Sequence, residues 1–191
     1  MKHSTSQGLK NIKAGQLLLA EPFMADPYFN RSVILLCEHN AEGSLGFIIN
    51  KPLDIQVNDL LQDFPQIDLS VSYGGPVQTD TIHFIHNLGD LLEESVPILP
   101  GIFWGGSFDK LKFLVDNQLA LPSNLRFFVG YSGWTEGQLQ EEMKFGSWLP
   151  AEADSNYIFK DEPGQLWQRI LDHKGDVYSV LARIPESNLL N

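Results

Sequence analysis

Histidines with nearby carboxylates are the residues of this sequence that could carry acid–base chemistry or bind a metal ion. His83 and His86 are three residues apart in a segment whose apolar residues predict a strand. Side chains alternate between the two faces of a sheet, so these histidines would point in opposite directions and could not share a metal ion there. A site formed by Asp80, His83 and Asp109 is geometrically possible, but we predict no metal ligand from it.

A catalytic role would need such groups to meet in one pocket. His39 ends a predicted strand and could form a small polar site with Arg31, although a hydrogen-bonded structural histidine is the favoured interpretation. A hydrolase that uses Asp80, His83 or His39 as acid–base groups is the enzymatic alternative. It requires these side chains to lie within hydrogen-bond reach of a common pocket.

Neither nucleophile candidate has the surroundings that catalysis needs. Residues 130–134 approach the pattern of a nucleophile elbow around Ser132, but the second glycine comes one place too early, so a turn serine is favoured. Cys37 lies in an apolar segment, where a buried and inert thiol is expected. The sequence has no phosphate loop, metalloprotease helix or paired zinc cysteines. We therefore predict no catalytic residue and no cofactor.

Three glycine-rich turns with aromatic neighbours are the most distinctive feature of the sequence. They occupy residues 73–77, 103–106 and 130–134, and two of them contain a tryptophan. Glycine lets the backbone adopt positive φ or approach another group closely, so the turns could line one groove with amides and aromatic faces. The alternative is a set of tight turns packed by large aromatic rings. For the turns alone we favour this alternative, because each one sits where a strand must end.

Alternating strands and short helices are predicted to position these residues. The extended segments are 17–20, 32–38, 45–50, 69–73, 81–87, 94–98, 102–104, 125–131, 147–149, 156–159 and 177–182. The helices are 57–64, one that Ser107 caps, 136–144, and one that Pro163 opens and Gly175 ends. Many strands with hairpin-length loops favour an α+β domain over a doubly wound parallel sheet.

The distribution of charge argues against direct nucleic-acid binding. The 191 residues include 13 Lys and Arg and 24 Asp and Glu, which gives a net charge of −11. No Lys or Arg occurs between Pro52 and Asp109. Nucleic-acid binding draws much of its affinity from cations that replace phosphate counterions, and a surface built from this stretch would repel phosphate.

Composition also bounds the class of protein. We predict a polar N-terminal tail over residues 1–14 and one domain over residues 15–191, with no signal peptide at the start. No apolar run is long enough for a membrane span. The single cysteine excludes an internal disulfide framework and fits the reducing cytoplasm.

Several motifs together resemble the YqgE/AlgH family of bacterial proteins. The resembling segments, in chain order, are 15–22, 29–39, 43–52, 74–77 with Asp80, 104–108, 130–134, 137–142 and Trp148. Each is weak alone, but their order and spacing are specific and they span nearly the whole chain. Lys51 stands where arginine is common in the family, and Ser107 where an acidic residue is common, which leaves any role for these two positions open.

The resemblance implies a single α+β domain with a bent, mostly antiparallel sheet, folded toward a pseudo-barrel and flanked by short helices. It implies little about activity, although some members are labelled transcriptional regulators. We expect a non-catalytic binding or regulatory module that acts through a protein or a small ligand. The candidate surface for that ligand comprises Arg31, His39, Asn50, Gly74, Gly75, Asp80, Trp104, Gly105, Gly106, Tyr131 and Trp134.

Overall fold

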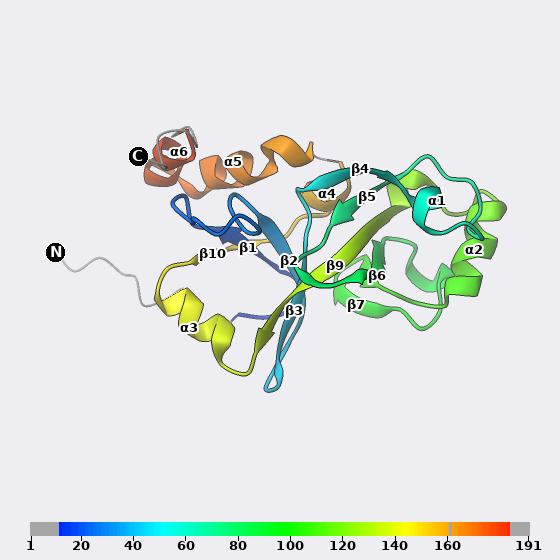
Figure 1. The fold of residues 1–191 in the computed structure, drawn as a ribbon, viewed down its shortest axis with the longest axis horizontal. Helices are drawn as coiled ribbons and strands as arrows, with labels where there is room; N and C mark the ends of the chain where they lie inside the picture. Colours follow the sequence, from blue (N-terminus) through cyan, green and yellow to red (C-terminus); the bar gives the residue numbers. More distant parts are fainter. Residues whose placement is uncertain (1–11, 161, 184–191) are drawn as a thin grey trace.

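A strongly bent sheet of ten strands forms the frame of the molecule (Figure 1). The computed structural model describes residues 12–160 and 162–183, so most of the predicted tail over residues 1–14 lies outside the described residues. The strands are β1 Gln16–Ala20, β2 Val33–Asn40, β3 Gly43–Ile48, β4 Pro52–Gln56, β5 Ser70–Tyr73, β6 Val77–His86, β7 Val96–Leu99, β8 Ile102–Trp104, β9 Leu125–Thr135 and β10 Trp148–Glu152.

The sheet is mostly antiparallel and branches at β9. Its main path runs β10-β1-β2-β3-β9-β6-β8-β7. The first half of β9 pairs with β6 and, in parallel, with β5, whereas its second half pairs with β3. β4 extends the branch beyond β5. The predicted fold class is confirmed: an α+β domain with a bent, mostly antiparallel sheet.

The sheet curls toward a barrel but stays open along the described strands. Its path ends at β10 and β7 without pairing these two strands. The curl nevertheless brings β7 against the segment before β1, because a Cβ atom added to Gly15 would lie only 2.7 Å from the carbonyl oxygen of Ile98. Gly15 has a φ of +88°, so both the close approach and the conformation suit glycine.

Short helices cover the sheet on both faces (Figure 1). They are α1 Val57–Leu60, α2 Phe108–Asp116, α3 Gln138–Lys144, α4 Ser155–Phe159, α5 Pro163–Lys174 and α6 Asp176–Ala182. None of the helices within the described residues is long and apolar enough to cross a membrane.

Three hydrophobic clusters join the helices to the sheet. Alternate residues of β2 point to opposite faces, and both faces are buried, which explains why its sequence is a continuous apolar run. Val33 and Leu35 pack with α4 and α5, whereas Ile34 and Leu36 pack with α3. The third cluster lies between α1, α2 and the strands β5, β6 and β9.

Arg126 on β9 fixes α4 to the sheet. Its guanidinium donates to the carbonyl oxygens of Ile158 at 2.7 Å and Ile49 at 2.8 Å, and to the hydroxyl of Ser72 at 3.0 Å. Burial lowers the pKa of Arg126 to about 10, so the side chain is still charged at neutral pH. One buried cation thereby joins three segments that are distant in sequence.

Two sequence predictions near the C-terminal end are wrong. Residues 156–159, predicted as extended, form most of α4, because the Asp154 side chain accepts the Asn156 N–H at 2.7 Å and so caps a helix. Residues 177–182, predicted as a strand, belong to α6, which packs beside α5. The β-branched Val177 and Val180 that suggested a strand are exposed on this helix.

Candidate functional site

Two of the three glycine-rich turns meet in space. The turn between β5 and β6 crosses β9 so closely that a Cβ atom on Gly74 would collide with the carbonyl oxygen of Gly130, and one on Gly75 with the backbone of Tyr131. The polar groups of Gly74 are already used: its N–H donates to Val129 and its carbonyl accepts the Ile48 N–H. These glycines therefore permit the close crossing of the β5–β6 turn over β9.

The third turn lies at the end of β8 and leads into α2. The Gly105 N–H donates to the carbonyl of Phe84, and the Gly105 carbonyl accepts from His86 Nε2 at 3.0 Å. A Cβ atom on Gly106 would lie 2.6 Å from Ser95 Oγ, so this glycine too serves a close approach. Gly105 and Gly106 thus contact β6 and the segment before β7, and none of these contacts is with the other two turns.

Aromatic side chains from two of the turns nevertheless gather around His83. The imidazole centroid lies 5.9 Å from that of Tyr131 and 6.4 Å from that of Trp104, and Phe47 lies beneath at 5.3 Å. All but Phe47 are only partly buried. Burial lowers the pKa of His83, whose Nε2 lies 3.0 Å from the Thr81 hydroxyl. The arrangement is a half-open aromatic cluster around His83, whose neutral form is favoured by burial.

Trp134 does not belong to this aromatic cluster. It lies three residues after Tyr131 in β9 and therefore points to the opposite face of the sheet. Only 6% of the residue is exposed, and its indole N–H donates to Glu142 Oε2 at 2.9 Å. The buried Trp148 donates to the same oxygen at 2.8 Å. The candidate Trp134 indole is therefore part of the packing under α3, although the residue is also among those that line the hollow beside Tyr131.

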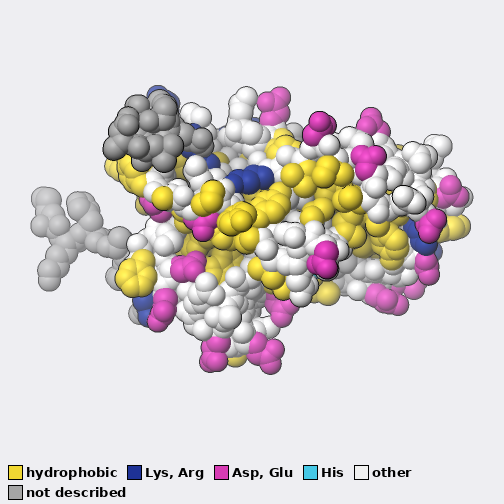
Figure 2. Space-filling model, viewed as in Figure 1, with side chains coloured by type: hydrophobic (Ala, Val, Ile, Leu, Met, Phe, Trp, Pro, Cys, Tyr) yellow, Lys and Arg dark blue, Asp and Glu magenta, His cyan; other side chains and the backbone are white. Residues whose placement is uncertain are grey.

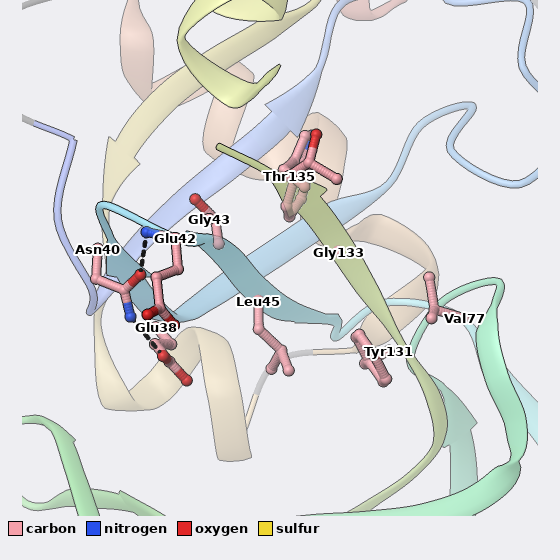
Figure 3. A pocket seen from close by; sticks show the side chains of 11 residues that line it. Glu38, Asn40, Glu42, Gly43, Leu45, Val77, Tyr131, Gly133 and Thr135 are labelled. Carbon is pink, nitrogen blue, oxygen red and sulfur yellow. Dashed lines mark hydrogen bonds between the residues drawn. The ribbon is translucent and has the colours of Figure 1, made fainter. Parts of the chain in front are cut away.

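A hollow of about 420 Å³ opens beside Tyr131. Leu45 from β3 and Tyr131 from β9 extend to the same side of the sheet, with Val77 of β6 next to them (Figure 3). Glu38 and Glu42 stand exposed at its rim, where Asn40 donates to Glu38 at 2.6 Å and accepts the Glu42 N–H at 2.8 Å. We call this hollow the Tyr131 recess.

The acid–base residues of the hydrolase alternative are not assembled. His39 pairs with Ser44 opposite the Trp134 end of β9, whereas His83 pairs with Phe128, six residues away along that strand. Six residues of strand span about 20 Å. His39 Nδ1 lies 2.7 Å from Ser44 Oγ, which fits the structural histidine, and Asp80 is exposed.

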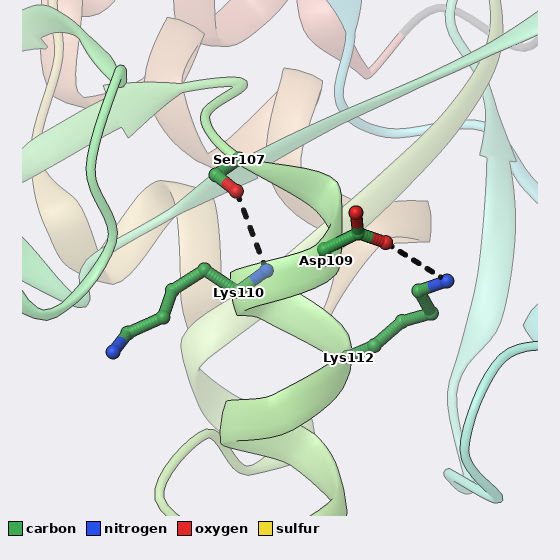
Figure 4. Close-up of polar contacts among 4 residues, drawn as sticks. All are labelled: Ser107, Asp109, Lys110 and Lys112. Atoms are coloured by element: carbon green, nitrogen blue, oxygen red, sulfur yellow. Dashed lines mark hydrogen bonds and ion pairs between the residues drawn. The ribbon is translucent and has the colours of Figure 1, made fainter.

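Asp109 is engaged elsewhere (Figure 4). It lies in the first turn of α2, where Ser107 Oγ accepts the Lys110 N–H at 3.4 Å, and its carboxylate lies 3.1 Å from the Lys112 ammonium. Within the described part of the chain, no three His, Cys, Asp or Glu side chains are grouped so that they could hold a metal ion. Cys37 is buried as expected, and burial raises the pKa of its thiol.

Arg31 and Asn50 lie together, but away from the Tyr131 recess. They line a separate cavity of about 440 Å³ between the turn before β2, the segment that joins β3 to β4, and α5. Residues that the sequence reasoning missed complete both sites: Leu45, Val77 and Glu38 in the recess, and Lys51 and Trp167 in the cavity. Strand alternation could have indicated Leu45, because it lies two residues before Phe47 on β3 and so shares the face on which Phe47 contacts His83.

Acidic side chains border an apolar band on the face shown in Figure 2, which fits the low content of Lys and Arg. Glu38, Glu42 and Asp80 are among the exposed carboxylates of β2, the β2–β3 loop and β6.

Comparison with known proteins agrees with this architecture. The sequence model of the AlgH-like family matches residues 17–179. UPF0301 proteins from Chlorobaculum parvum and Chlorobaculum tepidum are 44% and 45% identical over 175 residues, which cover 92% of this chain and 94% of each relative.

Two solved structures are similar over nearly their whole length. The solution structure of AlgH from Pseudomonas aeruginosa has a TM-score of 0.72 at 30% identity, and covers 97% of this chain and 98% of its own. A crystal structure of a Corynebacterium diphtheriae protein has a TM-score of 0.76 at 18% identity, and covers 96% and 95%. With the family match over most of its length, this chain belongs to the AlgH-like family.

Proposed function

We propose that this protein is a non-catalytic binding module that receives a protein or small-molecule partner in the Tyr131 recess. One observation carries the proposal: Tyr131 lines the recess, and its ring also contacts His83, which connects it to Trp104. Partly buried aromatic faces beside a concavity, with a few polar groups at its edge, are typical of sites that hold a ligand.

The lining favours a cationic partner with an apolar portion. Leu45 and Val77 supply an apolar wall, and the carboxylates of Glu38 and Glu42 stand at the rim. A lysine or arginine side chain could place its charge near these carboxylates and its alkyl part on the wall, with the Tyr131 ring available to the cation. The net charge of −11 would attract such a partner from a distance.

A regulatory role would act through this partner. The stretch between Pro52 and Asp109, which contains β4 to β8, carries no Lys or Arg, and this argues against direct contact with DNA. We assign the role to the cytoplasm, where a single buried thiol such as Cys37 is in keeping with the reducing conditions. The hydrolase alternative has less support, because His39 and His83 lie at different ends of β9.

Calorimetric titration with short peptides that combine Arg or Lys with apolar residues tests the proposal. We expect saturable binding, and we expect Tyr131→Ala to weaken it at least about tenfold, or ~1.4 kcal/mol. Glu38→Gln combined with Glu42→Gln should weaken it more at low salt than at high salt, since rim charges are screened.

The matched control is Phe145→Ala, which removes a side chain that is 86% exposed next to α3. Thermal unfolding of each variant verifies that it is folded. Binding of the peptides by Tyr131→Ala with unchanged affinity, or by Phe145→Ala with equally reduced affinity, would exclude the Tyr131 recess as the site.

A further inference from the structure

The cavity of about 440 Å³ around Arg31 is lined by cationic and amide side chains, whereas the Tyr131 recess has carboxylates at its rim. It lies between the turn before β2, the segment that joins β3 to β4, and the first turns of α5. Its lining residues are Pro27, Asn30, Arg31, Asn50, Lys51, Gly164, Trp167 and Gln168. Among these described residues two are cationic, three carry side-chain amides and none is acidic, in a chain whose acids outnumber its bases 24 to 13.

We propose that this cavity binds the phosphate group of a small molecule. Arg31 offers the planar, forked donor set that matches phosphate oxygens, and Lys51 offers a compact charge of the same sign. The amides of Asn30 and Gln168 can donate to further oxygens. The volume leaves room for more of the molecule than its phosphate group, so the ligand is a phosphorylated metabolite.

The backbone of Arg31 is fixed before any ligand arrives. Asn50 Oδ1 accepts the Val33 N–H at 2.7 Å, and Asn50 Nδ2 donates to the Arg31 carbonyl at 2.9 Å. These two bonds clamp the chain on either side of Ser32 and support a φ of +51° at Arg31, a conformation that non-glycine residues rarely adopt. A strained backbone that the surroundings hold in place is common where a side chain must be aimed.

The two cationic heads are also held by neighbours. The Arg31 guanidinium lies 5.0 Å from the centroid of the Trp167 ring, and Trp167 is itself fixed by the bond from its indole N–H to the Ala20 carbonyl at 2.9 Å. The Lys51 ammonium donates to the Tyr28 carbonyl at 2.7 Å. Charges that are already oriented lose little entropy on binding, which favours recognition of a small anion.

The amino end of α5 also borders the cavity. Gly164 lies in its first turn and on the cavity, and a Cβ atom at this position would meet no atom within 4 Å. The backbone of that turn is therefore approachable from the cavity, and the amino end of a helix carries a partial positive charge. It supplements the charges of the Arg31 and Lys51 side chains.

This proposal is independent of the Tyr131 recess. The cavity and the recess have no lining residue in common and opposite charge. Asn30, Arg31, Asn50 and Lys51 come from two of the segments on which the resemblance to YqgE/AlgH proteins rests, and the fold brings these two segments to one place.

The test is a titration of the ¹⁵N-labelled protein with inorganic phosphate and with pyrophosphate, followed by NMR. The indole N–H of Trp167 and the side-chain amide of Asn50 report on the cavity directly. We expect saturable shifts of both signals. Lys51→Met should weaken binding at least about tenfold, and Arg31→Lys, which keeps the charge but loses the fork, should weaken it as well.

The matched control is Lys144→Met, which removes the same charge from α3 and should leave the affinity unchanged. Because a change at Arg31 can disturb its packing on Trp167, the Lys51 variant decides the outcome on its own. Four results would overturn the proposal: shifts that do not saturate, wild-type affinity in Lys51→Met, an equal loss in Lys144→Met, or equally tight binding of succinate, which would assign the cavity to carboxylates.

Discussion

Glu142 is the residue whose removal tests the packing around α3 most sharply. One of its oxygens, Oε2, accepts the indole N–H groups of both Trp134, at 2.9 Å, and Trp148, at 2.8 Å. The two rings pack edge to face with centroids 5.7 Å apart, and both residues are more than nine-tenths buried. Glu142→Leu keeps a side chain of similar size but leaves two buried donors without their acceptor.

The expected loss follows from the number of bonds and the charge of the acceptor. A hydrogen bond to a charged group contributes about 1.5–3 kcal/mol, and a buried donor without an acceptor costs a comparable amount. The two bonds share one oxygen, so their effects do not add fully. We therefore expect Glu142→Leu to lower the free energy of unfolding by about 3 kcal/mol, a large part of the ~5–15 kcal/mol of a typical domain.

Urea unfolding followed by tryptophan fluorescence measures this loss. Glu142→Gln retains one acceptor oxygen and should lose less than Glu142→Leu. Glu141→Leu, a change of the same kind at the exposed neighbouring position, should stay within about 0.5 kcal/mol of wild type. If Glu142→Leu were as stable as Glu141→Leu, the two indole bonds would contribute nothing to stability and the reasoning would be refuted.

Three further predictions concern other buried groups. Burial lowers the pKa of both His83 and His86 in the folded protein, so the unfolded chain binds protons at a higher pH than the folded one. The free energy of unfolding should therefore fall as the pH drops below the ordinary histidine value of 6.5. Urea unfolding at a series of pH values measures this dependence, and His86→Gln should flatten it. Gly75→Ala would collide with the backbone of β9 and should lower the melting temperature, whereas Gly164→Ala, which meets no atom, should not; equal melting of the two variants would contradict the close crossing. Arg126→Met leaves two carbonyls and a hydroxyl without their donor and should speed amide hydrogen exchange in α4, with exchange in α3 as the unaffected reference.

Several strands of the sheet could be predicted from the sequence, because β1 and the first half of β2 are apolar and buried on both faces. The run from Val33 to Leu36 is buried on both faces of the sheet. The two-residue loop between Asn40 and Gly43 then fixes the hairpin of β2 with β3. The helix α6 could not be predicted in this way. Its valines favour a strand locally, and only the fold decides whether a sheet edge is available to them.

The candidate site was predictable in part. The opposite orientation of Trp134 and Tyr131 follows from strand alternation once β9 extends to Thr135, but the prediction ended this strand at Tyr131. By contrast, the crossing of Gly74 over Gly130 depends on the parallel pairing of β5 with β9, which joins residues distant in sequence. The meeting of Arg31 with Trp167 has the same long-range origin.

The place of β9 in the sheet has a consequence for biosynthesis. β3, β5 and β6 are all translated before β9, yet each uses it as a neighbour. Until Leu125–Thr135 has left the ribosome, these three strands present unpaired backbone, which is prone to pair with other nascent chains. We therefore expect the nascent chain to be most prone to wrong strand pairing before β9 emerges.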